Sequence, residues 1–157
     1  MTKILHDYQV KTVVGNKKIL VGGCFDILHQ AHREFLNKAK SLGDTLIVLL
    51  ESDENIRKLK GDKRPLNDIA RRAFKLSRIG AIDYIVLLAQ STSSEYYYNL
   101  VNSIKPDIIA ITKGDPLTDV KKDQAAMVGG DVIEVMERNP EHSTTALLKE
   151  NQTETKL

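Results

Sequence analysis

Short runs of aliphatic and β-branched residues alternate along the chain with longer segments in which apolar residues recur at helical spacing. The run at 45–51 (TLIVLLE) is apolar almost throughout, which is typical of a strand covered by helices on both faces. Four other runs have the length and composition of strands. The predicted strands are 18–23, 45–51, 84–88, 107–111 and 131–135.

Helical patterns fill the intervals between these runs, and polar residues or glycines mark their ends. Ser52 or Asp53 has a side chain suited to cap the second helix, and Asn67 the third. Gly43 and Gly80 follow the first and third helices, as glycine commonly does. The predicted helices are 31–41, 53–59, 67–79, 94–103, a segment that ends at 129–130, and 143–149.

The alternation of strands and helices predicts an α/β fold with a doubly wound, Rossmann-like, five-stranded parallel sheet. We expect a single domain over residues 1–150 and a disordered tail at 151–157, while residues 1–16 carry no clear pattern. In such sheets, ligands bind beyond the carboxyl ends of the strands, where the strand order reverses. This rule points to the loop after 18–23, the loop at 60–65, the turn at 112–116 and the segment before the last helix.

Charge and composition narrow the range of functions. The chain of 157 residues carries 23 Lys and Arg against 21 Asp and Glu, a net charge of +2, so we expect no nucleic-acid partner. The longest apolar runs are far too short to span a bilayer, which predicts no membrane partner. A single cysteine, Cys24, and the lack of a signal-peptide pattern at the N-terminus favour a cytoplasmic protein.

The loop after the first predicted strand carries the residues best suited to chemistry. Gly22 and Gly23 allow backbone N–H groups to approach a phosphate with no side chain between them. His29 and His32 stand three residues apart where a helix begins, so both imidazoles can lie on one side near the positive end of the helix dipole. The loop matches neither a Walker loop nor a G-x-G-x-x-G fingerprint. It predicts an anion site with two adjustable hydrogen-bond donors.

Residues 22–32 resemble the HxGH signature, usually written GxFDxxHxGH, of the cytidylyltransferase-like superfamily. Ala31 stands where the signature has glycine. Within the superfamily the chain looks most like the adenylyltransferase domain of ADP-heptose synthase, although such domains often carry asparagine at the position of Gly22. The other matching segments are Lys60-Gly61, Arg64-Pro65, Arg71-Arg72, Ala81-Ile82-Asp83, Lys105-Pro106-Asp107, Lys113-Gly114-Asp115 and 143–148 (STTALL).

The resemblance implies a nucleotidylyltransferase that transfers a nucleoside monophosphate, first of all AMP from ATP, to a phosphorylated small molecule with release of pyrophosphate. Heptose 1-phosphate is the leading acceptor, and Mg²⁺ would arrive with the nucleotide. A CTP-dependent enzyme of the glycerol-3-phosphate type and an FMN adenylyltransferase (FAD synthetase) are alternatives within the superfamily. A non-catalytic nucleotide-binding protein is the alternative from another class. Relatives are often dimers, so a homodimer is compatible with this assignment.

The resemblance also assigns roles to individual residues. His29, His32 and Lys60 are the predicted catalytic residues: the histidines would stabilise charge at the α-phosphate and on the leaving pyrophosphate, and Lys60 would hold phosphate from a mobile loop. Asp26 and Arg64 are the predicted substrate-binding residues, and no side chain is predicted to bind a metal. The predicted nucleotide-binding residues are Gly22, Gly23, Cys24, Phe25, Arg72, Thr112, Lys113, Gly114, Asp115, Ser143 and Thr144.

Structural roles compete with several of these assignments. Two capping or core histidines would explain His29 and His32 without a ligand, and a zinc site is disfavoured because no third or fourth ligand is evident. Cys24 is expected to pack rather than to react. The tyrosines at 96–98 are expected in the core and at an interface rather than stacked on a base. The pair Lys121-Lys122 is typical of a solvated helix face.

Overall fold

A parallel sheet in the order β1-β4-β3-β2-β5-β6 runs through the protein. The structure is a computed structural model that describes residues 1–90 and 93–137. All pairings within the sheet are parallel, as the alternation of strands and helices predicts. The strands are β1 (Lys3–His6), β2 (Lys18–Gly23), β3 (Thr45–Leu50), β4 (Tyr84–Leu87), β5 (Ile108–Lys113) and β6 (Asp131–Glu137).

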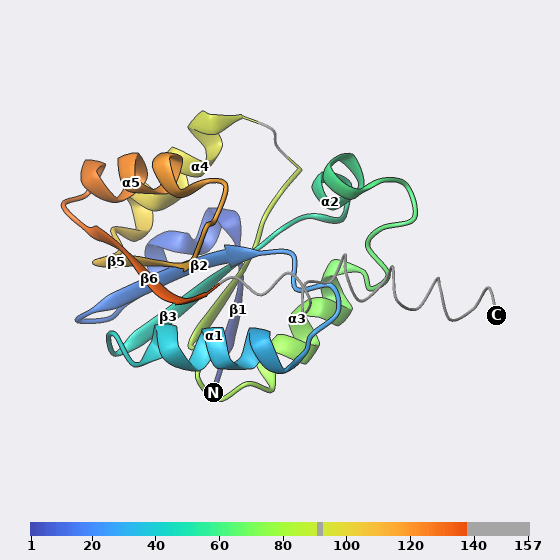
Figure 1. Ribbon diagram of the computed structural model, residues 1–157, viewed down its shortest axis with the longest axis horizontal. Helices are drawn as coiled ribbons and strands as arrows, with labels where there is room; N and C mark the ends of the chain where they lie inside the picture. Colours follow the sequence, from blue (N-terminus) through green and yellow to red (C-terminus); the bar gives the residue numbers. More distant parts are fainter. Residues whose placement is uncertain (91–92, 138–157) are drawn as a thin grey trace.

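Helices cover both faces of this sheet, as Figure 1 shows. Helices α1 and α3 lie on one face, while α4 and α5 lie on the other, and α2 stands beyond the end of β3. Among the described residues, no helix is long and apolar enough to cross a membrane. The helices are η1 (Asp7–Thr12, a 3₁₀ helix), α1 (Gln30–Lys40), α2 (Asp53–Lys60), α3 (Ile69–Ser77), α4 (Ser94–Ile104) and α5 (Thr118–Met127).

The prediction of five strands is one short, because β1 forms a sixth at the edge of the sheet. It pairs with β4 over its whole length, from Lys3 beside Tyr84 to His6 beside Leu87. Only one of its four residues is even half-buried, so the segment lacks the apolar run that marks the other strands. Residues 1–16, which show no pattern in sequence, therefore supply both an edge strand and η1.

Alternate residues of the central strands enter two separate cores. In β3, Leu46 and Val48 join the core beneath α1 and α3, whereas Ile47 and Leu49 join the core beneath α4 and η1. All six residues of the strand are buried. This explains why the run at 45–51 is apolar at every position from Leu46 to Leu50, since each side chain meets a helical layer on whichever face of the sheet it lies.

The helix ends agree in part with the predicted caps. Ser52 caps α2, because its hydroxyl accepts a hydrogen bond from the Asn55 N–H at 3.1 Å. The prediction for the next helix is wrong by one residue: Asp68, not Asn67, caps α3 by accepting from the Arg71 N–H at 2.9 Å. The backbone N–H of Asn67 instead binds the carboxylate of Asp26. The predicted helix 143–149 and tail 151–157 lie outside the described residues.

The strand order reverses between β2 and β5. From β2 the chain builds outward through β3 and β4, and then returns to place β5 on the other side of β2. Neighbouring crossover connections thus leave in opposite directions and open a crevice at the carboxyl ends of these two strands. Gly22 and Gly23 end one of them, and Thr112 and Lys113 end the other. The fold therefore brings two predicted ligand-binding segments to one place.

Leu46→Ala is expected to lower the free energy of unfolding by about 2–5 kcal/mol, because it leaves a cavity in a fully buried position. Leu59, whose residue is 73% exposed, provides the matched control. Leu59→Ala is expected to change stability by about 0.5 kcal/mol or less. Urea unfolding followed by circular dichroism measures both. Equal losses in the two variants would contradict a core that places Leu46 between the sheet and its helices.

Candidate active site

A cavity of about 220 Å³ opens at the switch point between β2 and β5. One wall comes from the end of β2 and the loop that leads into α1, and the facing wall comes from the end of β5 and the following turn. We call it the histidine cavity. It brings together eight of the predicted site residues: Gly22, Gly23, Cys24, Phe25, His29, His32, Thr112 and Asp115.

The two histidines stack against each other in this cavity. Their ring centroids lie 3.9 Å apart, and the ring planes differ by 26°. His29 occupies the N-cap position of α1, and His32 stands in the first turn, so the helical backbone places both rings on one side. The edge of His32 also meets Phe25, with ring centroids 5.2 Å apart. The predicted shared orientation of the two imidazoles is therefore present.

The surroundings of His32 keep its imidazole neutral. Burial, the neighbouring His29 and the positive charge of Lys60 together lower its pKa from 6.5 to about 4, against an opposing hydrogen bond to the backbone of Ile27. Lys60 is the last residue of α2, and its side chain is exposed. Although it does not line the cavity, its charge acts on His32 and on Cys24. The positive charge of Lys60 would favour an anion in the cavity.

The structure explains the glycines at positions 22 and 23 in different ways. Phe25 adopts a left-handed backbone conformation (φ 47°) and folds its ring over Gly23, where a Cβ would lie 2.7 Å from Phe25 Cε2. Gly23 is thus required by the packing of the protein itself. At Gly22 a Cβ would meet nothing closer than the carbonyl oxygen of Leu49 at 3.9 Å. The space in front of Gly22 is therefore open.

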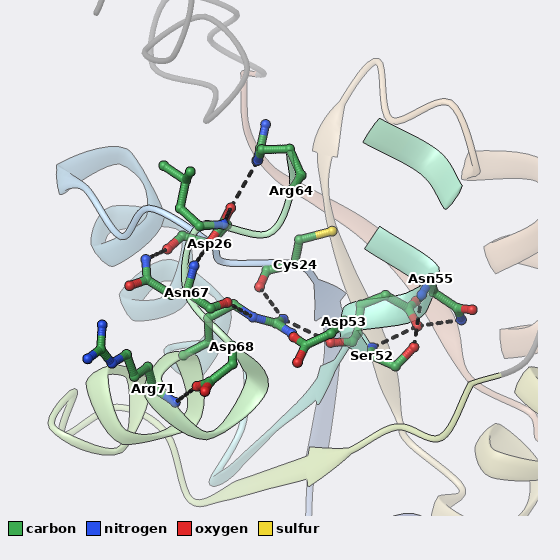
Figure 2. A network of polar contacts seen from close by, with 12 residues as sticks. Cys24, Asp26, Ser52, Asp53, Asn55, Arg64, Asn67, Asp68 and Arg71 are labelled. Atoms are coloured by element: carbon green, nitrogen blue, oxygen red, sulfur yellow. Dashed lines mark hydrogen bonds and ion pairs between the residues drawn. The ribbon is translucent and has the colours of Figure 1, made fainter. Parts of the chain in front are cut away.

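Asp26 does not line the cavity, and its predicted contact with substrate stays a prediction. Its carboxylate is fully enclosed and accepts hydrogen bonds from Leu66 N at 2.8 Å, Asn67 N at 2.9 Å and Arg64 Nε at 3.0 Å (Figure 2). Burial opposes ionisation, but these donors outweigh it and hold the pKa of Asp26 below its ordinary value. Asp26 instead fastens the loop after β2 to the segment before α3.

Arg64 is buried beside Asp26, and only part of its guanidinium is used. The Nη2 atom is buried with no hydrogen-bond partner among residues 1–90 and 93–137. Arg64 lines neither the histidine cavity nor the larger cavity beside it. Its contact with substrate therefore stays a prediction.

Arg72 holds the site together and lines neither cavity, and its predicted contact with the nucleotide stays a prediction. The side chain is fully buried. Its Nη1 donates to the carbonyl oxygens of Cys24 at 2.9 Å and Glu51 at 2.8 Å, while Nε donates to Asn67 O at 3.0 Å. Nη2 binds Asp53 Oδ1 at 2.6 Å. These bonds commit the guanidinium to the protein and tie together three segments: the loop after β2, residues 51–53 and the segment before α3.

The end of β5 and the turn that follows it contribute two of their four predicted residues to the cavity, Thr112 and Asp115. Lys113 does not line the cavity, but it forms an exposed ion pair with Glu137, which does. Gly114 has φ +82° with open space around it, so glycine is needed there for backbone conformation rather than for close approach.

Lys121 is a site residue that the sequence pattern does not reveal. It is predicted on a solvated face of its helix, but its side chain is 19% exposed and lines the cavity. Its Nζ lies 2.7 Å from Asp115 Oδ2, and Asp115 Oδ1 accepts from Leu117 N at 2.8 Å. A lysine six residues after an aspartate carries no sequence signal of its own, because the turn between them decides whether they meet.

A second cavity of about 550 Å³ lies on the face of the sheet covered by α4 and α5. It meets the histidine cavity at Gly22, Gly23, Cys24 and Lys121, which line both. Aliphatic side chains form most of its wall, and we call it the apolar cavity. Tyr97, which is predicted in the core, packs against the core beneath α4 and η1 and also lines this cavity. No sequence pattern indicates a second cavity.

Three further predictions concern the last helix, a bound metal and Cys24. Ser143 and Thr144, the predicted phosphate-binding residues of the last helix, lie outside the described residues. Within the described ranges, no group of three or more His, Cys, Asp and Glu side chains is arranged to hold a metal ion. Cys24 is half-buried, and burial is the main cause that raises its thiol pKa, which suits packing better than reactivity.

Comparison with known proteins identifies the family. A family model described as cytidylyltransferase-like matches residues 20–154. The chain belongs to the cytidylyltransferase-like family. The resemblance seen in the HxGH-like loop is thus confirmed, with Ala31 at the glycine position of the signature lining the histidine cavity of this cytidylyltransferase-like protein.

Among curated proteins, the chain is similar to longer bifunctional ones. The bifunctional protein HldE of Wolinella succinogenes is 38% identical over 141 residues, which make up 88% of this chain and 27% of that protein. The bifunctional protein HldE of Helicobacter pylori is 44% identical over 100 residues, 64% of this chain and 21% of that protein. This cytidylyltransferase-like chain therefore spans about a quarter of the length of these relatives.

Solved structures share its fold. A lipopolysaccharide core biosynthesis protein from Thermoplasma volcanium matches with a TM-score of 0.63 and 26% identity, over 78% of this chain and 97% of that chain. A pantoate-beta-alanine ligase from Francisella tularensis matches with a TM-score of 0.67 but only 14% identity, over 97% of this chain and 77% of that chain. The second likeness supports the fold alone.

Arg72→Lys is expected to lower the free energy of unfolding by about 3 kcal/mol, because a lysine keeps the buried charge but not the fork of donors. Arg71, the adjacent and exposed arginine, is the matched control, and Arg71→Lys is expected to leave stability nearly unchanged. Urea unfolding of the three proteins checks this. If Arg72→Lys were as stable as Arg71→Lys, Arg72 would have no structural role.

The stability of the protein is expected to fall as the pH drops from about 6.5 to 4. In that range the unfolded chain protonates His32, while the folded protein, with the lowered pKa, does not, so the unfolded state binds more protons. His32→Gln removes this group and should show a smaller loss of melting temperature over the same range. Scanning calorimetry at several pH values measures the difference. Parallel pH profiles for the two proteins would rule out a depressed pKa at His32.

Proposed function

We propose that this protein is a nucleotidylyltransferase that transfers AMP from ATP to a phosphorylated sugar, heptose 1-phosphate first, and releases pyrophosphate. The observation that carries the proposal is the stacked pair of histidines in a cavity at the switch point of a cytidylyltransferase-like chain. The kinship with the HldE proteins and with a lipopolysaccharide core biosynthesis protein supports a sugar phosphate as acceptor. ATP is preferred over CTP because the chain resembles adenylyltransferase domains.

The two connected cavities suit an in-line transfer. In the proposed reaction an oxygen of the acceptor phosphate forms a bond to the α-phosphorus of ATP while the bond from that phosphorus to the pyrophosphate oxygen breaks. Pyrophosphate leaves with the electron pair of the broken bond, so no covalent bond to the protein is needed. Positioning and charge neutralisation supply most of the rate enhancement in such reactions. The shared wall at Gly22 and Gly23 is where acceptor and donor phosphates would meet.

The side chains of the histidine cavity have distinct proposed roles. His29 and His32 bind phosphate oxygens, and the negative charge of a bound triphosphate favours the protonated form of His32, which has a second N–H to donate. The charge of Lys60 attracts the triphosphate from outside the cavity. Thr112 and the turn up to Asp115 lie against the base. Mg²⁺ accompanies the triphosphate and is bound through its phosphate oxygens and water. We further propose that the reaction takes place in the cytoplasm, and a homodimer is compatible with all of these roles.

Pyrophosphate release with pairs of nucleotide and acceptor tests the proposal. The panel combines ATP or CTP with heptose 1-phosphate, glycerol 3-phosphate and FMN. His29→Ala and His32→Ala are each expected to lower kcat by about a hundredfold to a thousandfold, because each removes a preorganised donor. Gln30→Ala, which changes an exposed residue between the histidines, should retain activity. All variants should remain folded by circular dichroism.

Two outcomes would contradict the proposal. Nucleotide binding without pyrophosphate release for any acceptor would indicate a non-catalytic binding protein. Turnover that survives in both histidine variants would place the chemistry elsewhere in the molecule.

A further inference from the structure

The polar side chains that reach into the apolar cavity include a bonded group of three, contributed by three different elements. Glu51 follows β3, Asn55 lies in α2 and Tyr97 lies in α4, and all three line the cavity. We call them the Glu51 cluster. None is predicted to be functional from the sequence, and the proposed transfer of AMP does not use them. A role for them rests on the proposed function, with the apolar cavity as the site of the acceptor.

Hydrogen bonds hold the carboxylate of Glu51 in one orientation. Its Oε1 accepts from Asn55 Nδ2 at 2.8 Å and from Ser52 N at 3.2 Å, and its Oε2 accepts from the Tyr97 hydroxyl at 2.9 Å. Asn55 Nδ2 also lies 3.2 Å from the Tyr97 hydroxyl, so the three side chains close a ring. The donors of Asn55 and Tyr97 are used within this ring. What the cluster offers to a ligand is an acceptor.

The carboxylate has room for one more donor. An ionised carboxyl group accepts about four hydrogen bonds, and residues 1–90 and 93–137 supply three of them to Glu51. A ligand that completes this set must bring a hydroxyl or an amine. Both are donors, and the charge of the cavity distinguishes between them.

Positive charge outnumbers negative charge among the residues of this cavity. Lys58 and Lys121 line it together with Glu51, the one acidic residue that the described part of the chain places in its wall. Lys121 is paired with Asp115, which belongs to the histidine cavity, whereas Lys58 is exposed. A ligand with a negatively charged phosphate and a neutral hydroxyl fits this arrangement. A ligand that carries an ammonium group instead of the hydroxyl does not fit, because it would add a positive charge beside these lysines.

The rest of the wall makes the cluster selective. Leu49, Leu88, Val101 and Ile109 line the same cavity and provide no side-chain hydrogen bonds, so they contact the carbon skeleton of a ligand. A ligand without the hydroxyl would leave the carboxylate short of a partner in a largely apolar surrounding, which is costly. The volume of about 550 Å³ is ample for a sugar phosphate, since small-molecule sites span roughly 300–1,000 Å³.

We infer that Glu51 is a specificity-determining residue that binds a hydroxyl group of a phosphorylated polyol acceptor. Asn55 and Tyr97 are positioning residues that keep its carboxylate turned toward the ligand. Gly22 supports this assignment, because the open space before it joins the cavity to the place where the phosphates would react.

Steady-state kinetics and direct titration of Glu51→Gln and Tyr97→Phe test the inference. Glu51→Gln is expected to reduce kcat/KM for heptose 1-phosphate about tenfold to a hundredfold, the range for a hydrogen bond to a charged group. KM for ATP should stay within about twofold, because the cluster does not line the histidine cavity. Tyr97→Phe should give a smaller loss in kcat/KM for the acceptor, since the carboxylate remains.

Two neighbouring substitutions serve as controls. Glu54→Gln changes an exposed carboxylate in the same helix as Asn55, and Tyr98→Phe changes a neighbouring tyrosine that does not line the cavity. Both should leave acceptor kinetics unchanged. Deoxy analogues of heptose 1-phosphate add a chemical test. Wild type should discriminate against the analogue that lacks the bound hydroxyl, and Glu51→Gln should lose that discrimination.

The result that overturns the inference differs from the one that overturns the proposed function. Equal acceptor kcat/KM in wild type and Glu51→Gln overturns the inference while transfer of AMP stands. A preference for ethanolamine phosphate over heptose 1-phosphate does the same, because it makes Glu51 a partner of a cation. If no acceptor releases pyrophosphate, the proposed function fails. Calorimetric titration with heptose 1-phosphate then decides the inference, which fails if wild type shows no binding or binds no more tightly than Glu51→Gln.

Discussion

The buried guanidinium of Arg72 is the interaction on which the rest of the site depends. It binds the backbone next to Gly23, the backbone at the end of β3, the first turn of α2 and the segment before α3. These segments carry the walls of both cavities. A buried cation is stable only when its donors are matched by acceptors, so the loop after β2, residues 51–53 and the segment before α3 must come together. Asp26 has the same role with the opposite charge, because its carboxylate accepts hydrogen bonds from N–H groups of the segment before α3.

This framework explains why two cavities of different character meet at one place. The histidine cavity offers donors and nearby positive charge, which suit a triphosphate. The apolar cavity offers aliphatic walls with one oriented carboxylate, which suit a carbon skeleton that bears hydroxyl groups. Gly22 and Gly23 separate them without side chains, although only Gly23 is forced to be glycine by its neighbours. The absence of a side chain at Gly22 is thus best understood as space kept for ligands.

Much of the fold is predictable because local pattern and global architecture agree. Each central strand is apolar on both faces, and helices separate the strands along the chain, so the parallel sheet follows from simple rules. The histidine pair is equally accessible to prediction. Its geometry depends on residues within one turn of α1 and needs no distant contact. The resemblance to a family then supplies the chemistry that spacing alone does not.

What the sequence determined by itself is therefore the local part: the central strands and helices, a cap of α2 at Ser52 or Asp53, and the two imidazoles side by side. The tertiary structure alone decided which charged residues face a ligand. Arg72, Arg64 and Asp26 match positions of a nucleotide-binding family, yet their partners come from segments far away in the chain and draw two of them wholly into the framework. Glu51 and Tyr97 are 46 positions apart and meet only because the end of β3 and α4 flank one cavity. Such contacts leave no periodic pattern in the sequence, because two distant residues form a hydrogen bond only when the fold of the whole chain brings them together.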